Sequence, residues 1–396
     1  MKISAAICEY NPFHNGHEYM LSEMKKGGAA YIVACMSGNF CQRGEAAVYD
    51  KYTRTKAALK GGADLVIELP VSFACAGAER FAYGGVSLID SLGCVDELVF
   101  GSECGDTELL TLIAEALADE KLNDELKNAL SHGVTFASAR QSALEKNIGE
   151  KASLLSQPNN ILAVEYIKAL RKINSDIQPR TILRKYADHD GDKEFNGFAG
   201  AKYIREKIIS GEDYKSLVPE YAFDIYNNAE FPPPLCGRMK KLEPVILYKL
   251  RTMDVSEIAC LPDISEGLEN RIISAVRDSA GVDELIDKIK TKRYTRARIQ
   301  RILMYALLGV KKNELSSKPC YIHILGFNEK GREILKIAKK SASLPVIMKY
   351  SDIKKADEQA QSDYIFESRA DDIYALTGEK PDICGRLMLT SAITES

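Results

Sequence analysis

Residues 2–17 read KISAAICEYNPFHNGH, and this stretch decides the fold. The apolar run over residues 2–8 predicts a first strand, residues 9–13 a turn, and the following residues a helix to about residue 26. The N-terminus of such a helix presents free N–H groups and a partial positive charge, which suit a polyphosphate. Gly16 has no side chain, so a ligand can approach the backbone there. The stretch therefore predicts a nucleoside triphosphate site.

His14 and His17 are three residues apart on the entering turn, so both imidazoles can face the same phosphates. Taken alone, a His-x-Gly-His pattern also fits a helix cap or chance. A metal site is a further alternative, but no third ligand lies nearby and Cys8 falls inside the predicted strand. The strand, turn and helix around the pair favour the nucleotide interpretation.

Composition bounds the class of protein. The 396 residues suffice for two or three domains, and 28% charged with 45% hydrophobic residues is typical of a globular chain. The ten cysteines include no C-x-x-C pair, and we see no signal peptide and no apolar run long enough to span a membrane. We expect a reduced, cytoplasmic protein without a membrane partner. A net charge of −3 means that any nucleic-acid surface must be local.

Apolar runs alternate with amphipathic segments through the first part of the chain. Predicted strands cover residues 30–35, 64–69, 95–100 and 180–184, and the last of these is expected to end the sheet. Predicted helices lie at 50–61 and 78–92, with two or three more between 106 and 170. This alternation predicts an α/β fold, with a doubly wound parallel sheet in a Rossmann-like nucleotide-binding domain over residues 1–230.

The rest of the chain divides at a proline run, residues 232–234, which cannot continue a helix. Residues 231–315 are predicted to form a mainly helical region. Residues 316–396 are predicted to form a small α/β unit, in which residues 320–348 give a strand, a helix and a strand.

Several polar segments follow predicted strands and should line one crevice, because ligands of such sheets bind beyond the carboxyl ends of the strands. Residues 37–45 read SGNFCQRGE and have the makings of a substrate-binding loop, or of an ordinary surface loop. Gly101 closes a strand, Arg184 ends another, and Asn160 lies at a helix start. The nearby Asp50, Lys51 and Arg54 either add charge to this crevice or form a solvated first turn.

One segment, residues 288–312, is strongly basic and contains no acidic residue. Its cations are Lys288, Lys290, Lys292, Arg293, Arg296, Arg298, Arg301, Lys311 and Lys312. Tyr294 interleaves with them and is placed to stack on a base. In a chain of net negative charge, such a run predicts contact with an RNA backbone.

Residues 9–17, with the hydroxyl, glycine and amide pattern of residues 37–45, resemble a known family. Further matches are residues 61–66, 68–70, 100–103, 158–162 and 292–295. Together they resemble the HxGH nucleotidylyltransferase superfamily and, within it, the bacterial tRNA(Met) cytidine acetate ligase family. The matches span most of the chain.

The resemblance implies a ligase that uses ATP and acetate to form acetyl-adenylate and diphosphate. It then implies acetylation of N4 of the wobble cytidine in elongator tRNA(Met), with His14 and His17 as catalytic residues that stabilise phosphate charge. Mg²⁺ is expected with ATP, without a protein-held metal site. The implied ATP-binding residues are Ile7, Cys8, Glu9, Tyr10, Asn11, Pro12, Phe13, His14, Asn15, Gly16, His17, Glu18, Tyr19, Met20, Gly101, Asn160 and Arg184. The implied tRNA-binding residues are Lys292, Arg293, Arg296, Arg298 and Arg301.

The superfamily's second signature, a serine-rich helix start ending in arginine, maps to residues 199–205. Arg205 is retained, but Gly200 stands where a hydroxyl residue is usual. Two alternatives therefore stay open: a small-molecule adenylyltransferase, and a noncatalytic RNA-binding protein with a degenerate nucleotide domain. The sequence does not fix the oligomeric state.

Overall fold

The computed structural model describes residues 1–118, 145, 149–184, 194–265 and 267–395. Part of the helical segment expected between 106 and 170 therefore lies outside the described residues. Within the described ranges, no helix combines the length and the apolar character needed to cross a membrane.

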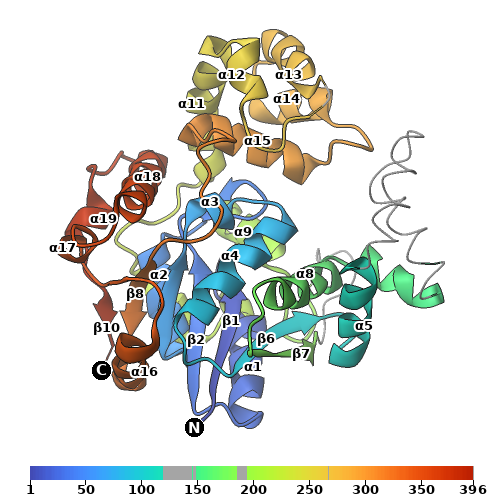
Figure 1. Cartoon of the computed structure of the whole chain (residues 1–396). Coiled ribbons are helices and arrows are strands. Elements are labelled where there is room, and N and C mark those ends of the chain that lie inside the picture. The colour runs from blue at the N-terminus through green and yellow to red at the C-terminus, as the bar shows by residue number, and fades with distance from the viewer. Residues whose placement is uncertain (119–144, 146–148, 185–193, 266, 396) are drawn as a thin grey trace.

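A single eight-stranded sheet forms the centre of the molecule (Figure 1). Its order is β10-β8-β5-β2-β1-β6-β7, with β9 beside β8. Five strands are parallel: β1 (Ile3–Cys8), β2 (Tyr31–Ser37), β5 (Leu65–Leu69), β6 (Glu97–Ser102) and β7 (Gln178–Leu183). Each coincides to within a few residues with a predicted strand. The parallel α/β sheet is thus confirmed, and the chain order crosses at β1, where ligands of such sheets bind.

Helices cover both faces of the sheet, because the inner strands are apolar on both sides. One face packs against α3 (Val71–Ala74), α4 (Ala78–Ser91), α5 (Thr107–Ala118), α8 (Pro158–Lys172) and α16 (Glu329–Ser341). The other packs against α1 (Asn15–Lys26), α2 (Lys51–Lys60), α9 (Ala201–Ser210) and α10 (Glu220–Asn227).

The C-terminal residues extend this sheet. The predicted strand–helix–strand unit is present as β8 (Ile322–Phe327), α16 and β9 (Val346–Ile347), and β10 (Ile393–Thr394) joins β8. Since β8 pairs antiparallel with β5, the expectation that residues 180–184 end the sheet is wrong. The strand β8 pairs with the edge of β5 that the other parallel strands leave free. Beyond β9 lie three helices, α17 (Tyr350–Ile353), α18 (Glu358–Tyr374) and α19 (Arg386–Leu389).

A helical region stands above the carboxyl ends of the strands (Figure 1). It consists of α11 (Arg238–Thr252), α12 (Val255–Ala259), α13 (Leu268–Arg277), α14 (Val282–Ile289) and α15 (Arg296–Leu308). These helices share an apolar core with a small hairpin of the nucleotide-binding part, formed by β3 (Phe40–Cys41) and β4 (Glu45–Ala46). The hairpin therefore joins the sheet to the helical region.

Candidate nucleotide site

The parallel strands end at one edge of the sheet, and the predicted site residues follow them there. His14 and His17 follow β1, the loop at Gly38 follows β2, and Arg184 follows β7. Gly101 lies in β6, and a Cβ built on it would be 3.1 Å from Cγ of Arg184. The structure thus brings together residues that the sequence spreads over 170 positions.

The two histidines form one stacked pair at the start of α1. Their ring centroids are 3.8 Å apart. Nδ1 of His14 accepts a hydrogen bond from the backbone N–H of Gly16 at 3.0 Å, and Nδ1 of His17 accepts one from the N–H of His14 at 3.3 Å. Because both Nδ1 atoms are acceptors, each neutral ring carries its proton on Nε2. Neither Nε2 donates to another described residue, so the pair offers two N–H donors to a ligand.

The surroundings keep both rings neutral. Burial lowers the pKa of His14 to about 3, and the positive charges of Arg184 and Arg205 add to that effect. The pKa of His17 also lies well below its usual range, because of burial and then the nearby His14 and Arg184. Two neutral donors beside two guanidinium groups form a site suited to an anion.

The rest of the implied ATP-binding stretch holds the turn in shape. The Asn11 carbonyl accepts from Nη1 of Arg205 at 2.9 Å, and the Phe13 N–H donates to the Tyr226 hydroxyl at 2.8 Å. Nδ2 of Asn15 donates to Gly197, and Glu18 accepts from Tyr221. Ile7, Tyr10, Pro12 and Phe13 are buried, whereas Cys8, Glu9, Tyr19 and Met20 are half-buried. These side chains position the histidines, and the backbone near Gly16 remains for a ligand.

Asn160 is buried at the start of α8, and all its groups are used within the protein. Its Oδ1 accepts from the N–H groups of Glu103 and Cys104 at 3.0 and 3.2 Å. Its Nδ2 donates to Leu154 and Gln157. The side chain thereby fixes the loop that follows Gly101. Glu103 in turn caps α8 by accepting from the N–H of Asn160 at 2.8 Å.

The second signature lies at α9, close to the histidines. Gly200 is the N-cap and makes no side-chain hydrogen bond to the first turn of α9. Arg205 lies between the Asn11 carbonyl and the Glu45 carboxylate, with Nη2 3.4 Å from Glu45 Oε2. The retained arginine therefore faces the site, as its effect on the pKa of His14 also indicates.

Asp50, Lys51 and Arg54 neither enter the crevice nor form a solvated turn, because all three are buried. Arg54 is fully buried and donates to four backbone carbonyls, those of Glu9, Ser37, Gly38 and Tyr49. It ties the turn before His14 to the loop after β2. Much of that loop, predicted to contact substrate, is likewise buried, although Arg43 is exposed and Glu45 half-buried.

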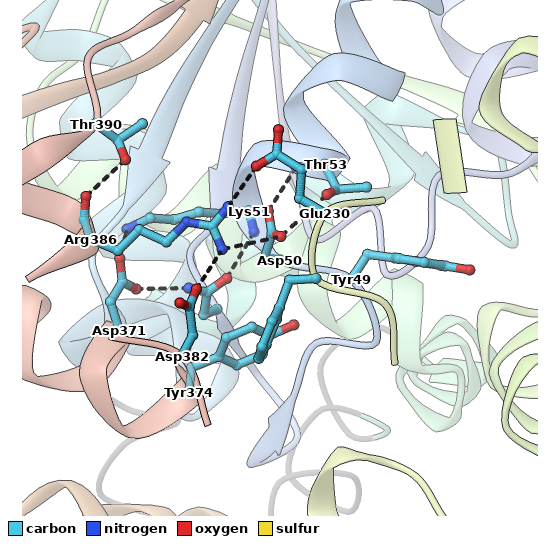
Figure 2. A network of polar contacts seen from close by, with 12 residues as sticks. Tyr49, Asp50, Lys51, Thr53, Glu230, Asp371, Tyr374, Asp382, Arg386 and Thr390 are labelled. Atoms are coloured by element: carbon cyan, nitrogen blue, oxygen red, sulfur yellow. Dashed lines mark hydrogen bonds and ion pairs between the residues drawn. The ribbon is translucent and has the colours of Figure 1, made fainter. Parts of the chain in front are cut away.

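Lys51 lies in a cluster of buried charges that sequence reasoning missed. Its Nζ is 2.6 Å from Glu68 and 2.7 Å from Asp371 of α18. Lys51 and Asp371 are labelled in Figure 2. Glu68 also contacts Nδ1 of His323 in β8 at 2.6 Å, and Asn39 donates to Asp371 at 2.8 Å. The partners are up to 332 positions apart in the chain, so no local pattern could reveal them.

Burial and neighbouring charges shift the pKa values of the carboxyl groups in this cluster. Burial would raise the pKa of Glu68, but Lys51 and His323 outweigh it and bring the pKa to about 2. The same burial, with repulsion from Glu68, raises the pKa of Glu367 well above its usual range. Three carboxylates, Glu68, Glu367 and Asp371, lie close enough to hold a metal ion, but the Lys51 ammonium already bonds two of them. The cluster therefore joins α18 to the sheet. At its rim, Arg386 reaches Asp50, Glu230 and Asp382 (Figure 2).

The basic segment separates into two kinds of side chain. Lys292 and Arg293 are exposed between α14 and α15. Arg296 is half-buried and pairs with Asp283 and Asp287. The other two implied tRNA contacts, Arg298 and Arg301, turn toward Asp263, which lies between α12 and α13. Arg298 donates to the Asp263 carbonyl, and Nε of Arg301 lies 2.9 Å from its carboxylate.

Tyr294 corrects one expectation. Its ring is only 9% exposed, packs into the core of the helical region, and has the Arg298 guanidinium 5.2 Å from its centroid. The aromatic residue was predicted to stack on a base, and this burial contradicts that role. Its flanking Thr291 and Thr295 shape the turn into α15 instead.

The chain is similar to known proteins over almost its whole length. A model of the HIGH Nucleotidyl Transferase family matches residues 1–384. A tRNA(Met) cytidine acetate ligase of Thermoanaerobacter sp. (strain X514) is 43% identical over 97% of this chain and 98% of its own length. One from Acetivibrio thermocellus is 41% identical over 96% of both. A crystal structure of Thermotoga maritima TmcAL bound with alpha-thio ATP has 33% identity and a TM-score of 0.91, and covers 100% of this chain and 99% of that one.

Proposed function

This chain belongs to the HIGH nucleotidyl transferases of the tRNA(Met) cytidine acetate ligase family, and we propose that it is an ATP-dependent ligase that acetylates a tRNA cytidine. ATP and acetate give acetyl-adenylate and diphosphate. The acetyl group then passes to N4 of the wobble cytidine of elongator tRNA(Met), giving N4-acetylcytidine and AMP.

The stacked histidine pair carries this proposal. Acetate attacks the α-phosphorus of ATP, and negative charge grows on the departing diphosphate. The Nε2–H donors of His14 and His17 stabilise that charge together with Arg184 and Arg205, without a covalent enzyme intermediate. Because the donors are fixed by backbone hydrogen bonds before ATP arrives, little reorganisation opposes the reaction.

The proposed ATP contacts are the backbone of residues 7–20, Gly101, the loop held by Asn160, and Arg184. Mg²⁺ would arrive on the ATP phosphates and neutralise part of their charge. The described residues provide no second carboxylate cluster for a protein-held ion, since the one at Glu68 is occupied by Lys51. The phosphate oxygens are thus the ligands we expect for it.

For tRNA, we propose the exposed side of the basic segment. Lys292 and Arg293 are exposed where α14 meets α15, so the phosphates of a tRNA can reach both side chains. Arg296 lies near them but is half-buried, and it forms ion pairs with two aspartates, Asp283 and Asp287. The setting we propose is the cytoplasm, where tRNA is found.

The test is exchange of labelled diphosphate into ATP by the purified chain. We expect exchange that depends on acetate and needs no tRNA, because the first step is complete within the nucleotide site. Exchange that requires another metabolite instead of acetate would favour the small-molecule adenylyltransferase. ATP binding without any exchange would favour the noncatalytic RNA-binding protein.

A further inference from the structure

A cavity of about 290 Å³ lies between the β3–β4 hairpin, α9 and the helical region. Its walls combine apolar side chains such as Ile209, Ile286 and Leu303 with charged ones, including Glu45, Arg205 and Glu243. This volume is near the lower end for small-molecule sites, about 300 Å³, and suits one nucleobase. Of its lining residues, Arg205 alone has a role in the ATP step assigned above.

Two contacts place the cavity next to the nucleotide site. Arg205 lines the cavity, donates to the Asn11 carbonyl in the turn before His14, and lies close enough to affect that histidine. From the other side, α14 and α15 line it through Ile286 and Gln300, and these helices flank the exposed Lys292. The cavity therefore lies between the proposed ATP and tRNA surfaces.

Glu45 is held between those two sides. Its Oε2 is 3.4 Å from Nη2 of Arg205, and its Oε1 accepts from Nε2 of Gln300 at 3.4 Å. Both contacts are long, and a carboxylate has about four lone-pair positions, so acceptor capacity remains. The backbone explains the position: Gly44 has φ +76°, and a Cβ there would lie 2.4 Å from the backbone nitrogen of Arg301. A glycine at position 44 therefore allows the β3–β4 hairpin to pack this closely against α15, and the next residue, Glu45, then lines the cavity.

We propose that this cavity binds the acceptor cytosine and that Glu45 accepts the proton of its exocyclic amine; the inference rests on the proposed function. A carboxylate is the group that pairs with cytosine N4, and single-stranded bases of RNA are read when splayed into such pockets. N4 attacks the acetyl carbonyl carbon of acetyl-adenylate and forms the C–N bond. The bond between the acetyl carbon and the AMP phosphate oxygen breaks, AMP leaves with the electron pair, and the N4 proton passes to Glu45.

The experiment separates the two steps in Glu45→Gln and Ile209→Trp. Glutamine keeps the shape but cannot take a proton, and tryptophan fills the cavity from a half-buried position. Diphosphate exchange measures the first step, and transfer of labelled acetyl from preformed adenylate to a tRNA(Met) transcript measures the second. We expect the ratio of transfer to exchange to fall about 100-fold in Glu45→Gln, the usual size of a general-base effect, and to fall clearly in Ile209→Trp.

Glu206→Gln is the matched control, since Glu206 follows Arg205 on α9 but is exposed and pairs with Lys202. Its ratio should equal that of the unmodified chain. An unchanged ratio in both cavity variants would overturn the inference, as would a parallel loss of both steps, which would assign Glu45 to the nucleotide site. Absence of exchange in the unmodified chain would instead contradict the proposed function.

Discussion

The histidine pair and the Lys51 cluster lie on two sides of the loop after β2, and their chemistry is opposite. His14 and His17 are neutral, and their Nε2 donors have no partner among the described residues. Lys51 is charged, fully buried, and bonded to two carboxylates. A group with unused hydrogen-bonding capacity is available to a ligand, whereas a group whose capacity is filled holds the fold. Residues of both kinds occur in the segments that resemble the family.

The largest effect that tests this comparison is expected in Lys51→Met. Removing the cation leaves Glu68 and Asp371 buried without it, which costs about 3–5 kcal/mol of the free energy of unfolding. Urea denaturation measures it. Lys60→Met on the same helix is the control, because Lys60 pairs with Glu395 at the surface and should cost less than about 1 kcal/mol. Equal losses in the two variants would contradict a structural role for the cluster.

His17→Ala should act on the reaction instead of the fold. Loss of one positioned donor lowers the rate of diphosphate exchange about 100-fold to 1,000-fold. The free energy of unfolding should change far less than in Lys51→Met, and tRNA affinity should not change. His14→Ala should show the same loss of rate and also lose an N-cap, worth about 1 kcal/mol. A folded His17→Ala protein with normal exchange would remove the pair from the mechanism.

The pH dependence of stability offers a smaller test. Burial lowers the pKa of His14 to about 3 in the folded state, against an ordinary value of 6.5. Between these values the unfolded state binds more protons, so stability falls as the pH drops below 6.5, by up to about 1.4 kcal/mol per pH unit. Urea denaturation at pH 8, 6 and 5 should show a flatter decline in His14→Asn than in the unmodified chain. Identical pH profiles would mean that His14 is not buried neutral.

The basic segment allows a comparison of exposed with half-buried cations, since Lys292 and Arg293 are exposed and Arg298 is half-buried. Lys292→Ala with Arg293→Ala should weaken tRNA binding and reduce the slope of log affinity against log salt by about 1–2, because up to two phosphate contacts are lost. Arg298→Gln should leave that slope unchanged and lower stability, because Arg298 bonds the Asp263 carbonyl and Ser265. If Arg298→Gln reduced the slope as much as the double variant, the division of this segment would be wrong.

The strands and helices around the proposed nucleotide site can be predicted from the sequence, because they depend on local patterns. The first strand, the turn and α1 follow from residues 2–26, and the parallel strands follow from apolar runs between amphipathic helices. Long-range pairing was not predictable. The antiparallel β8 pairs with β5 at positions such as Glu68 and His323, which are 255 residues apart, and Lys51 bonds Asp371 of the distant α18.

Charge runs show a similar limit. The segment from 288 to 312 contains no acid, yet Arg296 pairs with Asp283 and Arg301 with Asp263, and both aspartates precede the segment in sequence. The cations around Tyr294 predict an exposed aromatic side chain, but Tyr294 is buried in the structure. Glu45 belongs to residues 37–45, which the sequence predicts to bind substrate. The position of the cavity, which Glu45 lines, could not be predicted from that segment.

One measurement tests the central claim most directly. The purified chain is incubated with ATP, acetate and one of two elongator tRNA(Met) transcripts, with cytidine or uridine at the wobble position, and the nucleosides are analysed by mass spectrometry. The account predicts one N4-acetylcytidine per tRNA in the first transcript, dependent on ATP and lost in His17→Ala, and none in the second. No acetylcytidine in the first transcript, or equal acetylation of both, would contradict it.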